Sequence, residues 1–577
     1  TDPEEPLTLN GVVYNEMKGV FSSPDEMLER EIMNSMFPDT QYGVDSGGEP
    51  EVIPDLTYEA YLDFHRKYFH PSNCYIYLYG NMDAADTLDF IDREYLSRFE
   101  AAEVDSALRE QKPFGGERVT KKFYPVAAGD DIKKKTYLSM SFAAGDPLNS
   151  CEMVAMQVLD YALLGAPGAP VRKALLDAGI GLDVYGGFSD GILQPYFSIT
   201  AKDADEEDAD RFRRVIRETL EKQVSEGIDR KSVKAALSTL EFSYREADFG
   251  NYPKGLFYCM DVMETWLYDD DEPFATLKLL DVFREMEKLA ETDYFEKMIS
   301  EKFLRSDHSV LVILSPKPGL AEEMEMKTEE KLAAIKAGMS AEEIKELVSE
   351  TEALLAWQDS EDTPEAISTL PVLKRSDIRR EVTARSNIEE TITVKGDSGN
   401  EIKVPAVLHE KETNGIGYLQ IMFGTKAVPD EMIPYLGLLK ECLTYVSTAW
   451  HDYADLTNEI GVRSGGITFT SSVLDPVNAP DSYLSYFEVR MKALISKYED
   501  GTELIREILY TSDFTDEKRL REIVSKTRSQ LETALQSGGN ASASRRASAY
   551  TSSGSAYSEM ISGISFYRFI RDLERSF

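Results

Sequence analysis

Two stretches of the sequence read alike, and their spacing constrains the fold more than any other feature. Residues 137–147, YLSMSFAAGDP, and residues 418–429, YLQIMFGTKAVP, show the alternation of a strand with one buried face. Each is followed by a long helical pattern and then by Leu-x-x-x-apolar-Gly, which ends at Gly181 and Gly461. The first tyrosine and that glycine are 44 residues apart in one copy and 43 in the other. We therefore predict duplicated domains.

A second pair of segments marks the end of the repeat. Residues 61–80 and 295–315 both place an amphipathic helix before an apolar strand, and Phe69 matches Phe303 at an offset of 234 residues. One complete repeat therefore runs from about 115 to 316. We predict four parts: the second part of a catalytic-type first domain (1–105), a complete second domain (106–317), a helical hairpin with a linker (318–383) and an incomplete third domain (384–577).

Each repeat mixes strands with long amphipathic helices, such as 205–226 and 515–535. This predicts an α+β fold of tandem homologous domains, with helices on one face of a largely antiparallel sheet. Between the repeats, residues 319–358 are rich in Ala, Glu, Lys and Leu, and Ser340 with Glu343 forms a capping-box pattern. We predict a helical hairpin there, with an apolar stripe on its second helix (Ile344, Leu347, Val348, Leu354 and Leu355).

Charge and cysteine content exclude several classes of function. The chain has 103 acidic and 63 basic residues, a net charge of −40, which excludes nucleic-acid or anionic-membrane binding through a general basic surface. The excess of acidic residues indicates either a well-solvated acidic surface or a protein that acts on cationic substrates. The four cysteines lie far apart, so we expect a reducing compartment, the cytoplasm or an organellar matrix. No apolar run is long enough to span a membrane.

Five histidines offer the commonest metal-binding side chain, but no two of them show the i, i+4 spacing of helical zinc ligands. Neither H-x-x-E-H nor H-E-x-x-H occurs in the chain. We predict structural roles for all of them, namely His65, His70, His308, His409 and His451.

Two other kinds of segment are read as structural. The glycine pairs 47–48, 186–187 and 465–466 lack the pattern of a phosphate-binding loop and predict turns or bulges. Residues 536–563, QSGGNASASRRASAYTSSGSAYSEMISG, are small and polar and predict a mobile loop or hinge.

One acidic residue stands apart from these. In residues 11–20, GVVYNEMKGV, a helical period places Glu16 on one side with Val12 and Val13, and Gly19 and Val20 follow a turn later. A carboxylate buried on such a face must be neutralised, hydrogen-bonded or bound to a cation. Two interpretations remain open: a solvated or salt-bridged glutamate, and a metal-binding or catalytic one.

The stretch from residue 11 to residue 73 resembles the pitrilysin/insulinase group of zinc metallopeptidases, and more narrowly its presequence-protease branch. The resemblance continues through PVRKALLDAGIG, GGFSDGILQPYFSI and SRRASAYTSSGSAYSEMISGISFYRFIRDLE, and so covers essentially the whole chain. It implies four homologous α+β domains in two halves, linked by a helical hairpin and closing around a chamber.

The resemblance also implies a zinc site. In the family, two histidines of an H-x-x-E-H helix and a glutamate of a V-V-x-N-E-M-K-G motif hold Zn²⁺, and Glu16 occupies the position of that glutamate. The glutamate of H-x-x-E-H serves as general base on zinc-bound water. Because the sequence lacks H-x-x-E-H, we expect the general base upstream of Thr1, and the last domain beyond this chain. For the chain alone we expect no catalytic residue, no bound zinc and no peptidase activity.

Two functions follow as hypotheses. In the first, the parent protein is a zinc metalloendopeptidase that degrades unfolded peptides in a closed chamber, with basic peptides favoured by the acidic composition. In the second, it is a non-catalytic homologue that acts as a scaffold or peptide-binding partner of an active peptidase. The expected partners are peptides and the remainder of the same polypeptide, with no nucleic acid and no membrane.

Overall fold

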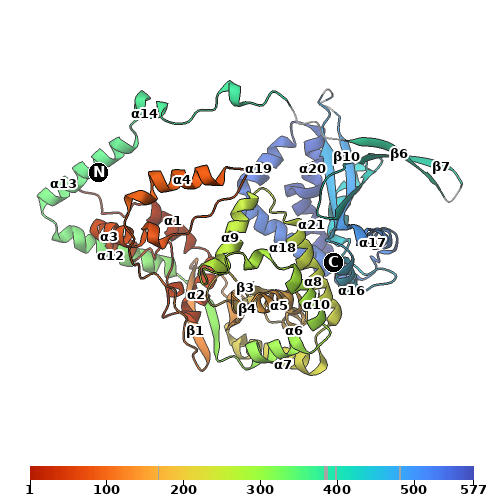
Figure 1. Ribbon diagram of the computed structural model, residues 1–577, viewed down its shortest axis with the longest axis horizontal. Coiled ribbons are helices and arrows are strands. Elements are labelled where there is room, and N and C mark those ends of the chain that lie inside the picture. Colours follow the sequence, from red (N-terminus) through yellow and green to blue (C-terminus); the bar gives the residue numbers. More distant parts are fainter. Residues whose placement is uncertain (167, 382–386, 397–398, 478, 480–481) are drawn as a thin grey trace. The chain divides into compact units, whose positions relative to one another are not determined.

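The computed structural model describes residues 1–577 except 167, 382–386, 397–398, 478 and 480–481 (Figure 1). Contacts divide the chain into two compact units. The first unit comprises Thr1–Val12 and Gly319–Asn414, and the second comprises Val13–Pro318 and Gly415–Phe577. Both contain helices and strands, so the predicted α+β class is confirmed. The predicted domain boundaries after residues 105, 317 and 383 remain predictions.

A five-stranded sheet organises residues 13–318 of the second unit. Its strand order is β1 (Gly116–Val126), β5 (His308–Pro318), β2 (Thr136–Ala143), β4 (Tyr196–Ala204) and β3 (Asp183–Ser189). β1 and β5 run parallel, and all other neighbours run antiparallel, as the sequence predicts. The glycine pair 186–187 forms no turn but lies inside β3, where a Cβ on Gly186 would lie 2.2 Å from the Ser198 carbonyl oxygen. Only glycine permits this approach of the two strands.

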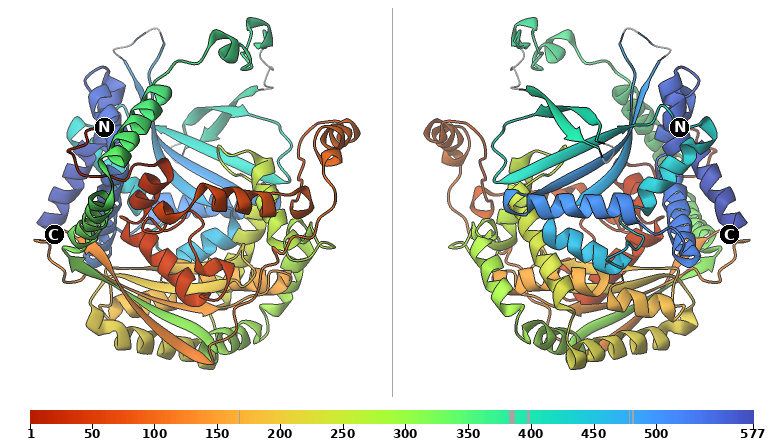
Figure 2. Two further views of the ribbon diagram at one scale, coloured as in Figure 1. Left: turned by 90° about the vertical axis from the view of Figure 1, so that its left-hand side faces the viewer. Right: turned by 90° about the vertical axis from the view of Figure 1, so that its right-hand side faces the viewer.

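Helices cover both faces of this sheet, not one face as predicted (Figure 2). Because side chains alternate along a strand, Leu138 and Met140 of β2 face a core formed with α5 (Ser150–Asp160), α7 (Ala209–Glu226) and α8 (Arg230–Glu246). Tyr137 faces the opposite side, which α2 (Pro24–Met36) covers with Leu28, Ile32, Met36 and the following Phe37. Residues 24–37 therefore bury their apolar side chains against strands of the complete repeat at residues 115–316.

A second sheet repeats part of the first. Its strand order is β8 (Ile416–Gly424), β10 (Leu484–Leu494) and β9 (Ile467–Leu474), which reproduces the antiparallel order β2, β4, β3. A separate core packs this sheet against α15 (Ile433–Cys442), α16 (Tyr453–Arg463) and α17 (Tyr498–Thr511). The two segments that read alike in the sequence form β2 and β8, so the topology confirms the predicted duplication.

The predicted mobile loop at 536–563 is wrong. These residues contribute to α18 (Glu517–Ser537) and form α19 (Gly539–Ser548) and α20 (Ser553–Ser562), and α21 (Ile564–Ser576) follows. A Cβ on Gly437 of α15 would lie 2.6 Å from the Ile561 carbonyl oxygen, so α15 and α20 pack at close range. α20 buries Tyr557 and Ile561, and this tertiary packing overrides the weak helix propensity of serine and glycine.

The apolar strand predicted after Phe69 is also absent. Cys74–Gly80 follows α3 (Tyr58–Tyr68) in an irregular conformation, and Tyr75 and Tyr79 are exposed. The equivalent residues 308–318 form β5, which has β1 and β2 as neighbours. Residues 74–80 pair with no strand among the described residues, and an apolar run without a neighbouring strand does not form a ladder.

The first unit contains two helices where the sequence predicts a helical hairpin, and the packing of the two as a hairpin stays a prediction. They are α12 (Leu320–Gly338) and α13 (Ala341–Gln358), and Met339 and Ser340 lie between them. The predicted capping box at the start of α13 is confirmed. Glu343 N donates to Ser340 Oγ at 3.2 Å, and Ser340 N donates to Glu343 Oε2 at 2.7 Å. Neither helix has a fully buried residue: in the apolar stripe of α13, Leu347, Leu354 and Leu355 are exposed, and Ile344 and Val348 are partly buried. α14 (Pro364–Ser368) and the hairpin of β6 (Ile388–Lys395) with β7 (Glu401–Leu408) complete this unit.

Several further helices belong to the second unit. They are α4 (Ala84–Glu94), α6 (Pro170–Asp177), α9 (Lys254–Trp266), α10 (Leu280–Leu289) and α11 (Tyr294–Met298). Among the described residues, every helix is too short or too polar to cross a membrane.

Candidate functional site

Helix α1 (Val12–Val20) carries Glu16, the predicted metal ligand. The helix ends where Phe21 N bonds to the Met17 carbonyl oxygen at 2.9 Å. Ser23 then starts α2 by accepting a hydrogen bond from Glu26 N at 3.4 Å, and Pro24 occupies the first helical position, where it needs no backbone partner. Residues 21–23 therefore separate α1 from α2.

Glu16 is exposed, which corrects the expectation that its carboxylate requires a partner. The apolar face predicted around it exists, but α1 buries none of its residues, and Val12 and Val13 are 83% and 54% exposed. A carboxylate in water keeps its hydration and pays no burial cost. The described residues therefore contact only one side of α1, and they leave Glu16 and the two valines uncovered.

A cavity of about 440 Å³ with a mixed apolar and polar lining adjoins this helix. It lies between α1, α2 and the loop 41–47. Its lining is apolar at Met17, Val20, Phe21, Met27, Met33, Tyr42 and Val44, and polar or charged at Glu26, Glu29, Arg30, Asn34, Gln41, Asp45 and Ser46. The cavity therefore combines adaptable methionine side chains with carboxylates and a guanidinium. Met17 lines the cavity, whereas the neighbouring Glu16 does not, because successive side chains of a helix point in different directions.

Arg30 of α2 holds the loop that closes the cavity. Its guanidinium carbon lies 4.0 Å from the centre of the Phe21 ring, and its Nε lies 2.8 Å from Asp45 Oδ2. The glycine pair 47–48 forms the predicted turn, in which Gly48 N bonds to the Asp45 carbonyl oxygen at 3.1 Å with a φ of +86°. A Cβ on Gly47 would lie 2.4 Å from Met17 Sδ, so glycine here leaves room for a methionine that lines the cavity.

The histidines have the structural surroundings expected for them. His308 is buried, its Nε2 lies 2.8 Å from the Met36 carbonyl oxygen at the end of α2, and burial lowers its pKa. His451 Nδ1 lies 2.7 Å from Glu507 Oε1. His65 and His409 are exposed, and His70 is half-buried: His65 stacks on Phe69, His70 accepts from Ser72 N, and His409 contacts Asn387.

The places of Glu16 and of the five histidines decide whether residues of this chain alone could bind a zinc ion. A catalytic zinc takes three protein ligands from His, Glu, Asp or Cys. Within the described ranges, no three or more such residues gather in a way that could hold a metal ion. One exposed carboxylate does not make a zinc site, so Glu16 fits zinc only together with ligands from elsewhere. Sequence reasoning found Glu16 but missed the cavity, whose signal is the spacing of Met17, Met27 and Met33 across two short helices.

Comparisons with known proteins cover the whole chain. The family model described as "Peptidase M16 inactive domain" matches residues 55–240, and a model for a region associated with M16 peptidases of subfamily C matches residues 314–573. Protein HypA of Clostridium perfringens is 36% identical over 572 residues, which cover 99% of this chain and 58% of that protein. Presequence protease 1, chloroplastic/mitochondrial, of Arabidopsis thaliana is 34% identical over 585 residues, covering 100% of this chain and 53% of that protein.

Among solved structures, pitrilysin aligns with 97% of this chain and 56% of its own, at 13% identity and a TM-score of 0.47. The chain spans about half the length of the curated relatives it matches. Two M16 family models, and alignments with two relatives over 99% and 100% of this chain, agree with the resemblance stated from the sequence. The chain belongs to the M16 peptidase family, within which it is similar to the presequence-protease branch.

Proposed function

We propose that the intact protein is a zinc-dependent endopeptidase that degrades unfolded peptides, and that Glu16 is one of its zinc ligands. The observation that carries this proposal is the setting of Glu16. It is exposed on a face of α1 that the described residues leave uncovered, on the same helix as two exposed valines. An exposed apolar face with a carboxylate at its centre is the surface expected where a further part of the domain packs.

The remaining zinc ligands and the general base would come from polypeptide outside residues 1–577. The sequence has no H-x-x-E-H, and Glu16 has no companion ligands among the described residues. Residues 1–577 alone therefore hydrolyse no peptide in this proposal.

The net charge of −40 favours basic peptides, because a negative field raises the local concentration of cations. Relatives named presequence proteases are mitochondrial or chloroplastic by their names. We propose the cytoplasm for this protein, or an organellar matrix if the source is eukaryotic.

The test joins residues 1–577 with the polypeptide encoded upstream, if that region contains H-x-x-E-H, and measures cleavage of an unfolded basic peptide with and without chelator. We expect chelator-sensitive cleavage, and a loss of more than about 100-fold in Glu16→Gln, since even residues that only support a metal ligand cost 10–100-fold. Glu59→Gln, an exposed glutamate on α3, is the matched control. Full activity of Glu16→Gln would refute the assignment.

A second candidate function is a non-catalytic scaffold or peptide-binding partner of an active peptidase. The favouring observation is that residues 55–240 match a family model described as an inactive domain. An upstream region without H-x-x-E-H, together with peptide binding in the absence of hydrolysis, would support this function and exclude the first.

A further inference from the structure

Helix α1 carries Glu16 but contributes no buried residue that would fix its position. It is 9 residues long, and none of these residues is buried. Isolated helices shorter than about 12–15 residues are only marginally stable in water, so contacts with the rest of the chain must stabilise and orient α1. The direction in which α1 presents Glu16 therefore depends on the side chains that lie around this helix.

Phe21 is the first of these side chains. It directly follows α1, and its backbone N–H bonds to the Met17 carbonyl oxygen at 2.9 Å, so the ring is joined closely to the helix. The guanidinium carbon of Arg30 lies 4.0 Å from the centre of the Phe21 ring, as in a cation–π contact. The side chain of Arg30 is only 16% exposed, and such contacts are stronger where water is excluded.

The loop 45–49 is the second contact of α1, and Arg30 binds it as well. A Cβ on Gly47 would lie 2.4 Å from Met17 Sδ, so the sulfur of this α1 residue packs directly against the loop. Arg30 Nε lies 2.8 Å from Asp45 Oδ2, and Arg30 Nη2 lies 3.5 Å from Glu49 Oε1. One guanidinium thus joins the residue that follows α1 to the loop on which α1 packs.

The charges of the loop require the guanidinium. Burial raises the pKa of Asp45, the charge of Arg30 opposes this rise, and Glu49 adds to it. A third carboxylate, Glu31, lies 3.8 Å from Arg30 Nη2 but also pairs with Lys122. Without Arg30, Asp45 and Glu49 would be two like charges with no shared cation, and the loop would lose the contact that fixes it to α2.

Small tilts of α1 have a large effect at Glu16. Glu16 precedes Phe21 by five residues, a distance of about 7.5 Å along a helix that rises about 1.5 Å per residue. A tilt of about 10° at Phe21 would therefore move the backbone of Glu16 by about 1.3 Å. Metal-binding and catalytic groups must be held to within about 0.5 Å, so a ligand on α1 requires a fixed helix.

We propose that Arg30 is a positioning residue for Glu16. It fixes α1 through Phe21 and through the loop 45–49, and thereby fixes the direction of the Glu16 carboxylate, which it does not itself bind. This inference rests on the proposed role of Glu16 as a zinc ligand. It adds a residue that lies outside the motif around Glu16, on the next helix of the chain.

Hydrogen exchange of residues 1–577 on the millisecond timescale tests the effect of Arg30 on α1. In Arg30→Met we expect the amides of residues 16–21 to exchange about 5–30-fold faster, because a cation–π contact and an ion pair are lost. The amides of α7, on the other face of the sheet from α2, should keep their rates, whereas loss of a merely stabilising residue would raise both. Arg30→Lys keeps the positive charge but not the planar group, so it should restore part of the protection.

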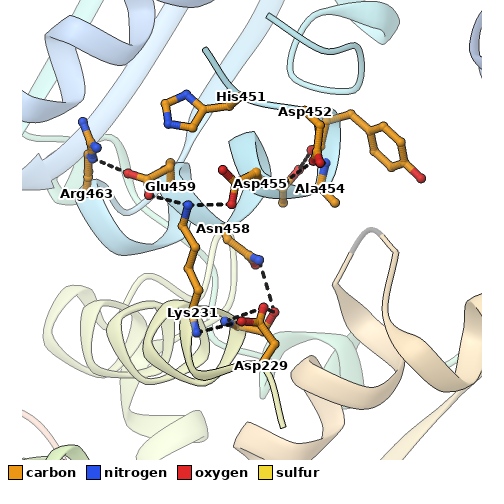
Figure 3. Close-up of polar contacts among 12 residues, drawn as sticks. Asp229, Lys231, His451, Asp452, Ala454, Asp455, Asn458, Glu459 and Arg463 are labelled. Atoms are coloured by element: carbon orange, nitrogen blue, oxygen red, sulfur yellow. Dashed lines mark hydrogen bonds and ion pairs between the residues drawn. The ribbon is translucent and has the colours of Figure 1, made fainter. Parts of the chain in front are cut away.

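Lys231→Met is the matched control, because Lys231 is also a partly buried cation with two carboxylate partners. Its Nζ lies 2.6 Å from Asp455 Oδ1 and 2.6 Å from Glu459 Oε1, and it joins α8 to α16 instead of acting on α1 (Figure 3). This variant should leave the exchange of residues 16–21 unchanged.

A double variant separates positioning from the effect of an unpaired charge. Arg30→Met with Asp45→Asn removes the carboxylate that Arg30→Met leaves without its cation. We expect residues 16–21 still to exchange faster than in the wild type, since the contact with Phe21 is absent in both variants. A return to wild-type rates would attribute the effect to the unpaired charge and would overturn the positioning role.

Zinc affinity gives the second measurement, in residues 1–577 joined with the polypeptide encoded upstream. In equilibrium competition with a chelator, we expect Arg30→Met to weaken zinc binding by at least about tenfold, since residues that support a metal ligand contribute about 10–100-fold. Unchanged zinc affinity in Glu16→Gln would refute the proposed function, and with it the role of Arg30. Weaker binding in Glu16→Gln but not in Arg30→Met would refute the role of Arg30 alone, as would wild-type exchange of residues 16–21 in Arg30→Met.

Discussion

His308 joins α2 to the central sheet, and its replacement by Phe tests how that joint responds to pH. The ring is 3% exposed, its Nε2 lies 2.8 Å from the Met36 carbonyl oxygen, and the Phe114 ring centre lies 4.2 Å away. Phe retains the shape and the ring contacts but leaves a buried carbonyl without its donor. An unsatisfied buried acceptor costs about 1–3 kcal/mol. We expect His308→Phe to destabilise the packing of α2 by about this amount at pH 7.5.

The same substitution should change the dependence on pH. Burial lowers the pKa of His308 below its ordinary 6.5, so between the two values the unfolded chain binds more protons than the folded one. The neutral ring therefore contributes stability that is present above pH 6.5 and is lost as the pH falls through the lowered pKa. One histidine gives a slope of at most about 1.4 kcal/mol per pH unit. His308→Phe removes this slope, so the two proteins should converge in stability at acidic pH.

Hydrogen exchange of the α2 amides, followed from pH 5.5 to pH 7.5 after correction for intrinsic rates, measures this local stability. His65→Phe is the control, because His65 is exposed and stacks only on Phe69. The reasoning is refuted if the deficit of His308→Phe grows on acidification, or if the variant retains the wild-type slope.

Three further outcomes follow from the structure. Gly47→Ala should displace Met17 from the cavity, because the added Cβ would lie 2.4 Å from the Met17 sulfur, and the Met17 methyl resonance should shift. Gly19→Ala is the control: a Cβ there would have no atom within 4 Å, so the Met17 resonance should not shift. Leu28→Ala should cost about 2–5 kcal/mol in the packing of α2 on the sheet, measured by urea-dependent exchange, whereas the exposed Leu88→Ala should cost almost nothing. Metal analysis of residues 1–577 after dialysis should find less than one zinc per chain, and a tightly held stoichiometric zinc would contradict the assignment of Glu16 as one ligand among several.

Local patterns in the sequence predict much of this structure. The capping box at Ser340 and the apolar spacing of α7 involve residues within a few helical turns of one another, so both can be predicted from the sequence alone. The repeated strand pattern at 137 and 418 predicts equivalent strands, and the two sheets share their antiparallel order. The motif around Glu16 assigns the family, because it consists of neighbouring residues in one short helix.

Only the tertiary structure decided what depends on residues distant in the chain. Cys74–Gly80 has the composition of a strand but no neighbour to pair with among the described residues, and the serine-rich segment 536–563 is helical because α15 packs closely on it. The exposure of Glu16, the cavity beside it and the contact of Lys231 with α16 likewise depend on which elements lie opposite. Hydrophobic periodicity and helix capping depend on interactions between residues that are close in the sequence. Strand pairing, burial and ion pairing depend on contacts between distant residues, which exist only in the folded chain.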